Sequence, residues 1–143
     1  MEAEFDRLPF QGDQFDLAVF NASLHYSTDY RITLEEALRV LHPEGKIVVL
    51  DSPVYRDAQS GEQMVKERER HFERTYGCPS NSLQSEHFLT FERLDDLAAE
   101  LGLTWRRLRP AYGFKWRLQQ WRESLFGSRE PATFLMLVGT RKG

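Results

Sequence analysis

The chain has 143 residues, of which 41% are hydrophobic and 13% aromatic, an ordinary globular composition that allows one domain with a core. Its formal net charge of −3 gives no overall argument for nucleic acid or an anionic membrane as a partner. The single cysteine, Cys78, excludes an internal disulfide, and no apolar run approaches the roughly 18 residues that a membrane helix needs. We therefore expect one cytoplasmic domain over residues 1–143.

The first third of the chain predicts a βαβ unit. Short apolar runs at 15–20 and 47–50 are typical of strands in a parallel sheet that is covered on both faces. Between them, apolar residues recur at helical spacing: Leu34, Ala37, Leu38 and Leu41. Pro43 ends this helix, and Gly45 allows the turn into the second strand.

Downstream of Asp51, the pattern changes to charged helices separated by loops. Residues 57–76 predict a helix whose Met64, Val65, Arg68 and Phe72 share a face, and residues 77–87 have the composition of a loop. Thr90 is a candidate N-cap for the next helix, which ends at Gly102.

The last part of the chain predicts two strands and an aromatic helix. Alternation over 103–109 indicates a strand, and the run TFLMLVG within 132–140 indicates a buried one. Residues 114–126 predict the helix between them. We expect the two strands to form an antiparallel pair at a sheet edge.

Four short motifs follow one another in a fixed order. They are Leu8-Pro9-Phe10, Phe15-Asp16, Leu24-His25 and the run RVLHPEG at 39–45. Their order and spacing resemble the second half of a class I S-adenosylmethionine-dependent methyltransferase of the small-molecule type, although Glu44 replaces the first of two usual glycines.

The resemblance implies an α/β fold, specifically a partial Rossmann-like methyltransferase sheet. Parallel strands would be followed by an antiparallel edge pair, with covering helices and a variable insert at about 54–90. It also implies S-adenosylmethionine as the cofactor and a small-molecule acceptor.

One family feature has no counterpart in this sequence. Family members bind the cofactor through a Gly-rich turn and a later acidic residue, because glycine lets the backbone approach the ligand closely. The nine glycines of this chain are scattered singly. We therefore interpret the chain as a truncated portion of a methyltransferase, with weak or no cofactor binding and activity by itself.

By position in the motifs, four residues are expected at the cofactor. Glu4 stands where an acidic residue accepts from the adenine amino group, and Phe5 follows it. Asn21 and Ala22 come at the carboxyl end of the first strand, where ligands bind in open α/β sheets. The alternatives to cofactor binding are that Glu4 is a solvated terminal residue and that Asn21 caps its own backbone.

The resemblance also places residues near the transferred methyl group. His25 is a candidate base and Asp51 a candidate acceptor-side residue, while Tyr26 and Tyr55 are candidates for substrate contact. Methyl transfer needs a base only if the nucleophile carries a proton. Two alternatives remain open. His25 would only pack and form hydrogen bonds, and Asp51 would cap a turn.

Other chemistries find little support. The four histidines show no paired zinc spacing, so we expect no metal. Arginines and aromatics alternate over 105–122, which can serve RNA binding, but spacings of three and four favour core packing with a basic outer face. A non-catalytic interaction domain with the same fold is the main alternative to an enzyme.

Truncation would leave one side of strand 15–20 without its usual neighbour. An exposed apolar edge strand tends to pair with another chain. We therefore expect a homodimer, or dependence on a partner chain, through this edge.

Overall fold

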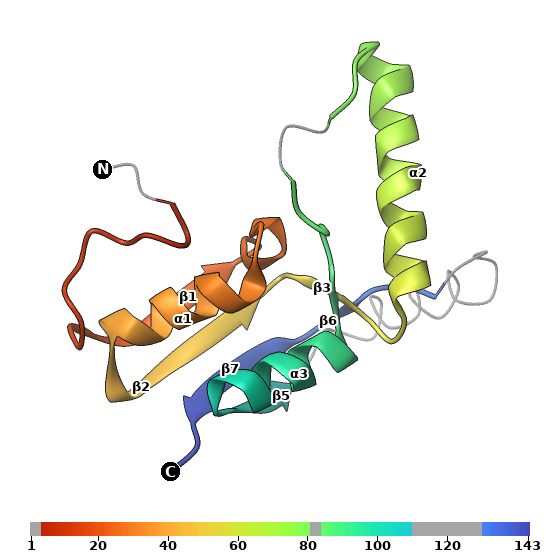
Figure 1. Ribbon diagram of the computed structural model, residues 1–143. Helices are drawn as coiled ribbons and strands as arrows, with labels where there is room; N and C mark the ends of the chain where they lie inside the picture. The colour runs from red at the N-terminus through yellow and green to blue at the C-terminus, as the bar shows by residue number, and fades with distance from the viewer. Residues whose placement is uncertain (1–3, 81–83, 110–129) are drawn as a thin grey trace.

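The computed structural model describes residues 4–80, 84–109 and 130–143 (Figure 1). The predicted helix at 114–126 lies outside these residues. The elements are, in chain order, β1 (Phe15–Asn21), the 3-10 turn η1 (Leu24–Tyr26), α1 (Tyr30–Val40), β2 (Leu41–Leu50), β3 (Pro53–Tyr55), α2 (Ala58–Tyr76), β4 (Leu89–Thr90), α3 (Phe91–Leu101), β5 (Leu103–Leu108), β6 (Thr133–Phe134) and β7 (Met136–Arg141).

The predicted βαβ unit is confirmed. β1 and β2 pair in parallel, with Ala18 opposite Ile47, and α1 connects them. Asp29 caps α1 by accepting a hydrogen bond from the Ile32 amide at 3.1 Å. β2 starts earlier than predicted, at Leu41, and its register with β1 shifts between Phe15 and Leu17. The shift lies at the segment with Pro43 and Gly45, which the sequence indicated as a turn.

The antiparallel pair expected at a sheet edge is confirmed. The main sheet has the order β1-β2-β7-β5, so β7 and β5 form one edge of it, with β7 next to β2 and β5 outermost. The run at 132–140, predicted as one strand, divides at Leu135. The first part, β6, joins the small sheet β4-β3-β6, and the second part pairs with β2 and β5.

One face of the main sheet is buried and the other is not. α1 and α3 lie on the same side of it (Figure 1), and their leucines pack on inward residues of the strands such as Phe20, Ile47 and Leu137. On the opposite face of β1, Phe15, Leu17 and Val19 are 37%, 52% and 52% exposed. The expectation that the parallel strands are covered on both faces is therefore wrong for β1.

α2 stands away from the sheet, joined to it mainly at its first turns (Figure 1). Asp57 caps its start, and Gly77 ends it in the left-handed conformation with φ of 70°. The only fully buried residue of α2 is Gly61, because the Phe88 ring lies where a Cβ would be, 2.3 Å away. The predicted helix is thus confirmed, and its apolar stripe is only half-buried.

Gly139 in β7 gives a first test of the packing. Trp105 lies opposite it on β5, and a Cβ at Gly139 would be 2.6 Å from the indole ring. The ring is held by a hydrogen bond from its Nε1 to the Leu94 carbonyl at 2.9 Å, so it resists displacement. Gly139→Ala should lower the free energy of unfolding by about 1–3 kcal/mol, measured in urea. Gly143→Ala, where the added methyl meets nothing, is the control. Equal stabilities of the two variants would contradict this account.

Arg141 gives a second test, at the carboxyl end of α1. Its guanidinium donates to the carbonyl oxygens of Leu38 at 2.5 Å, in the last turn of α1, and of His42 at 2.6 Å, near the start of β2. Arg141→Met keeps the aliphatic stem but loses these bonds, so stability should fall by about 1–3 kcal/mol. Arg31→Met, which breaks an exposed ion pair with Glu35, should cost less than about 1 kcal/mol. A reversed ranking in thermal unfolding would refute the assignment.

Candidate functional site

The carboxyl ends of β1 and β2 bring several predicted site residues together. Asn21 pairs with Leu50 in the sheet register, and the Ala22 amide donates to the Leu50 carbonyl at 2.9 Å. Asp51 follows Leu50 directly. Asp51, about 30 residues later in the sequence, therefore lies at the same edge of the sheet as Asn21 and Ala22, and all three are exposed.

The backbone at this edge adopts conformations that side chains rarely accept. Ala22 has φ of 48° and Asp51 has φ of 50°, both in the left-handed region. His87, in the loop before β4, has φ of 63°. Such residues persist only where the surrounding structure imposes them, and they gather at ligand sites.

His25 is buried beneath this edge, with 6% of its surface exposed. Its Nδ1 lies 3.1 Å from the Ser52 hydroxyl, and Ser52 is the residue after Asp51. Burial, together with the nearby His87 and Arg68, lowers the pKa of His25 from 6.5 to about 4. The imidazole is therefore neutral at physiological pH.

Tyr26 connects His25 to the loop before β4. Its ring centroid lies 4.2 Å from that of His25 and 5.8 Å from that of His87. The Ser85 hydroxyl also donates to the His25 carbonyl at 3.1 Å. Tyr26 keeps 36% of its surface exposed, so it is the part of this aromatic group that a ligand can reach.

The N-terminal motif is held against α1. The Arg39 guanidinium donates to the carbonyls of Leu8 at 3.3 Å and Phe10 at 2.9 Å, and the Leu8 amide donates to the Glu36 carboxylate at 2.8 Å. The hydrogen bonds from Arg39 hold the pKa of Glu36 below its usual value. These contacts explain why the Leu-Pro-Phe and Arg-Val-Leu motifs occur together.

Of the two N-terminal candidates, Phe5 lies near the strand end. Its ring is 6.4 Å from that of Phe20, the residue before Asn21. Glu4 forms an isolated bridge with Arg7 and is exposed. The structure thus brings Phe5 beside Phe20, the residue before Asn21, and it leaves Glu4 accessible.

Tyr55 is placed differently from the other predicted site residues. It is 2% exposed, and its ring meets that of Phe88 at 5.9 Å between centroids. Its position is that of a core residue under α2, and its substrate role stays a prediction.

Three residues of this region were not among the sequence candidates. Ser52 and His87 contact the group directly, and Arg68 of α2 contributes its charge. Ser52 adjoins Asp51 and could have been found as a residue that follows a strand. The other two come from the insert, and only the folded structure shows that it approaches His25.

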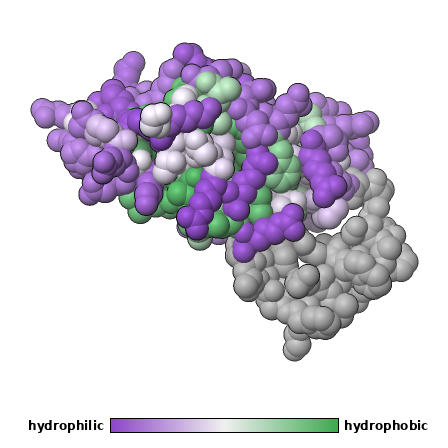
Figure 2. Space-filling view, turned by 90° about the horizontal axis from the view of Figure 1, so that it is seen from below, coloured by the Kyte–Doolittle hydropathy of each residue, from purple (hydrophilic) through white to green (hydrophobic). Residues whose placement is uncertain are grey.

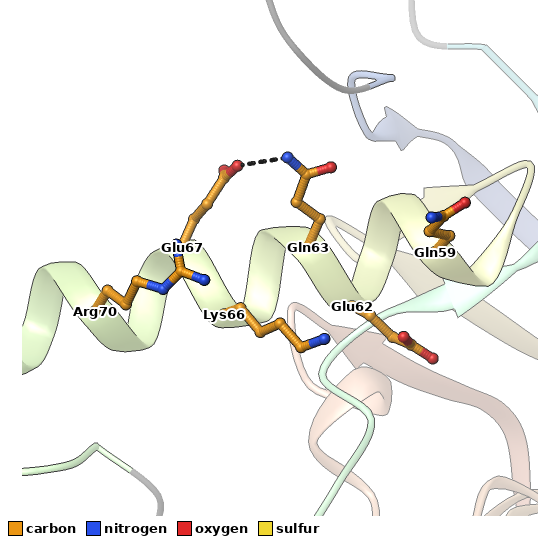
Figure 3. Close-up of a pocket in the computed structure, with 6 residues that line it drawn as sticks. All are labelled: Gln59, Glu62, Gln63, Lys66, Glu67 and Arg70. Atoms are coloured by element: carbon orange, nitrogen blue, oxygen red, sulfur yellow. Dashed lines mark hydrogen bonds between the residues drawn. The ribbon is translucent and has the colours of Figure 1, made fainter.

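Two concave surfaces among the described residues lie away from these side chains. One runs along the polar side of α2 and is lined by Gln59, Glu62, Gln63, Lys66, Glu67 and Arg70 (Figure 3). In this view Gln63 donates to Glu67. Another lies beside α3 and β5. Neither includes a predicted site residue, and no three His, Cys, Asp or Glu side chains in the described part are placed to hold a metal ion.

Sequence comparison finds a family match at the start of the chain. Residues 1–49 match the family described as "Methyltransferase domain". A sterol 4-C-methyltransferase of Caenorhabditis elegans, strm-1, is 32% identical over 84 residues, which is 59% of this chain and 25% of the relative. The chain thus spans a quarter of the length of this curated relative.

Solved structures extend the similarity to the whole chain. The YcgJ protein of Bacillus subtilis matches 100% of this chain and 71% of its own, with a TM-score of 0.65 and 14% identity. An S-adenosylmethionine-dependent methyltransferase of Thermotoga maritima matches 99% and 63%, with a TM-score of 0.56 and 20% identity. A Haloferax volcanii structure of a complex with the Trm112 methyltransferase activator matches 99% and 60%, with a TM-score of 0.61 and 18% identity.

These findings confirm the resemblance that the motifs carry. At this level of identity the solved structures show the fold, and the family match adds the methyltransferase character of the N-terminal third. The chain is thus similar to methyltransferases: its first 49 residues match the methyltransferase-domain family, and its fold resembles that of solved S-adenosylmethionine-dependent methyltransferases.

Proposed function

We propose that this chain serves methyl transfer from S-adenosylmethionine to a small-molecule acceptor, and that it does so as one portion of a larger methyltransferase domain. The observation that carries the proposal is the gathering of Asn21, Ala22 and Asp51 at one sheet edge, in a chain whose first 49 residues match the family. Open α/β sheets bind ligands outside the carboxyl ends of their strands.

The residues present fit part of a cofactor site. Asn21 offers an amide donor and acceptor, Asp51 offers a carboxylate, and the exposed Phe5 ring can cover a planar group beside them. The Gly-rich turn that would let a backbone approach the ligand has no counterpart in the sequence. When bound, S-adenosylmethionine supplies an activated methyl group for displacement by the acceptor.

The work left to this chain is positioning and exclusion of water. Tyr26 is the accessible member of the aromatic group, so it can contact the acceptor while His25 and His87 hold it in place. Neutral His25 can accept a proton, but its lowered pKa makes it a weak base at neutral pH. Orientation of Tyr26 through stacking is therefore the role of His25 that the geometry supports best, with proton acceptance as the alternative.

The site also requires a partner. In the described part of the chain, no strand pairs with the outer edge of β1. We propose that a second copy or a different chain pairs there. No described helix is long and apolar enough to cross a membrane, and we place the protein in the cytoplasm.

A non-catalytic interaction domain is the second candidate, and the same open edge favours it. An RNA-binding module would use residues 105–122, which lie mostly outside the described residues. Steeply salt-dependent RNA affinity would distinguish that module from both other functions.

Calorimetry with S-adenosylmethionine tests the function. The chain alone should bind in the millimolar range or not at all. A folded chimera, in which the residues of the sterol methyltransferase relative that precede its matched stretch are fused to Met1, should bind at least tenfold more tightly. In the chimera, Asn21→Ala should weaken binding about tenfold through one lost hydrogen bond.

Gln14→Ala, an exposed amide at the opposite end of β1, is the matched control for Asn21→Ala and should leave cofactor affinity unchanged. A chimera that does not bind the cofactor, or one in which both variants behave alike, would refute the proposed site.

His25 makes stability depend on pH. Its folded-state pKa lies below that of the unfolded chain, so the unfolded state binds more protons between pH 6.5 and 4. The contribution of neutral His25 to the free energy of unfolding is complete above pH 6.5. Up to about 3 kcal/mol of it is lost as the pH falls to 4. His25→Asn should lack this component in urea unfolding, and exposed His42→Asn should retain it. Parallel pH profiles for wild type and His25→Asn would contradict the assignment.

A further inference from the structure

A buried hydrogen bond joins the start of α1 to the chain that returns from α2. Residues 84–90 follow α2 and end in β4, and we call them the return segment. The Tyr30 hydroxyl donates to the Phe88 carbonyl at 2.7 Å, and both residues are buried. They lie 58 positions apart in the sequence. The bond therefore fixes one part of the chain against a distant one.

This hydrogen bond distinguishes the region more clearly than apolar surface does. Seen from below, the molecule shows hydrophobic residues at its surface between hydrophilic ones (Figure 2). Exposed apolar area of this kind is ordinary for a folded chain. Burying a hydroxyl, in contrast, is costly unless it finds a partner. Burial also raises the pKa of Tyr30, so its hydroxyl stays protonated and donates throughout the physiological pH range.

The Phe88 ring fixes the return segment against two further elements. It lies where a Cβ of Gly61 would be, 2.3 Å away, so α2 approaches it closely. It also meets the Tyr55 ring of β3 at 5.9 Å between centroids, and the next residue, Leu89, pairs with Val54. In Figure 1 the return segment runs between η1 and the first turns of α2. Three elements, α1, α2 and β3, thus hold it at one residue.

The residues just before Phe88 contact the candidate site. The His87 ring lies 5.8 Å from that of Tyr26, and the Ser85 hydroxyl donates to the His25 carbonyl at 3.1 Å. His87 has φ of 63°, a conformation that a residue other than glycine keeps only where the surrounding structure imposes it. The fixed position of Phe88, directly after His87, supplies such a constraint.

The path from Tyr26 to Tyr30 is short and held by hydrogen bonds. The Ser27 hydroxyl lies 2.7 Å from that of Thr33, and the Ser27 amide donates to the Leu24 carbonyl at 3.0 Å. The Tyr30 hydroxyl therefore has a defined place relative to the Tyr26 ring. Its hydrogen bond sets where the return segment meets that ring.

We propose that Tyr30 is a positioning residue of the candidate site, which fixes the return segment through Phe88 and thereby orients Tyr26. Tyr30 is only 3% exposed, so it acts through the return segment and not by touching a ligand. The contact of Tyr26 with an acceptor rests on the proposed function, whereas the fixing of the return segment does not.

The pKa of His25 reports whether the return segment is in place. Burial, together with the charges of His87 and Arg68, lowers it from 6.5 to about 4. His87 belongs to the return segment and Arg68 to α2, and Phe88 packs between these two parts of the chain. Displacement of Phe88 should therefore bring the pKa of His25 back toward 6.5.

An NMR titration of the histidines in the full-length chain tests the inference. Tyr30→Phe removes only the hydroxyl, so the chain should fold. The pKa of His25 should rise by about one pH unit or more, and the NOEs between the rings of Tyr26 and His87 should be lost. Tyr76→Phe is the matched control, because this tyrosine is 67% exposed, and it should leave both readouts unchanged.

A matched pair of glycine variants gives an independent test. Gly61→Ala places a methyl group 2.3 Å from the Phe88 ring and should also raise the pKa of His25. Gly139→Ala places one 2.6 Å from Trp105, in the part of the sheet formed by β7 and β5. It should destabilise the chain and leave the pKa of His25 unchanged.

An unchanged pKa of His25 in folded Tyr30→Phe would overturn the inference. An equal rise in Gly139→Ala would also overturn it, because the effect would then be a general loosening of the fold. If Tyr30→Phe does not fold, an unchanged pKa of His25 in Gly61→Ala decides against the inference.

The inference and the proposed function fail separately, because the titration uses the chain without cofactor. If the pKa of His25 responds as expected but the chimera does not bind S-adenosylmethionine, the positioning role stands and the function is wrong. If the chimera binds the cofactor but the pKa does not respond, the function stands and the positioning role is wrong.

Discussion

The parallel pairing of β1 with β2 is the constraint on which the rest of the structure depends. It aligns the carboxyl ends of the two strands, and thereby brings Asn21 and Asp51 to one edge of the sheet. It also requires the crossover helix α1, which contributes Tyr30, Leu34 and Ala37 to the core. The remaining elements attach to this unit, with β7 and β5 added antiparallel beside β2.

The two sides of this βαβ unit differ in strand pairing and in how far their side chains are covered. Toward β7, hydrogen bonds and helix packing are satisfied, and Arg141 joins the last strand to the end of α1. Toward the outer edge of β1, apolar side chains are half-exposed and the candidate site ends without a Gly-rich turn. Both features lie on the side of β1 where no described strand pairs with it.

Much of the fold could be predicted from the sequence because its signals are local. Thr90 does accept from the Arg93 amide, and Gly102 does end α3 in the left-handed conformation. The division of residues 132–140 at Leu135 could not be predicted, because a run of apolar residues does not say which strands its two parts pair with. Two small-sheet strands, β3 and β4, also depend on partners distant in the sequence.

The candidate site was predictable where it followed the strand ends and not where it depended on the insert. Asn21, Ala22 and Asp51 follow strands, so their meeting could be expected. The approach of His87 to Tyr26 depends on how residues 84–90 return to the sheet, and periodicity carries no information on that. Burial of Tyr55 depends on Phe88, which belongs to the same returning segment.

Amide hydrogen exchange of the chain alone tests the central claim most directly. If β1 is an uncovered edge, its outward-pointing amides should exchange far faster than those of β2 and β7, which lie inside the sheet. Protection across β1 equal to that of β2, in a chain that sediments as a monomer, would contradict the account.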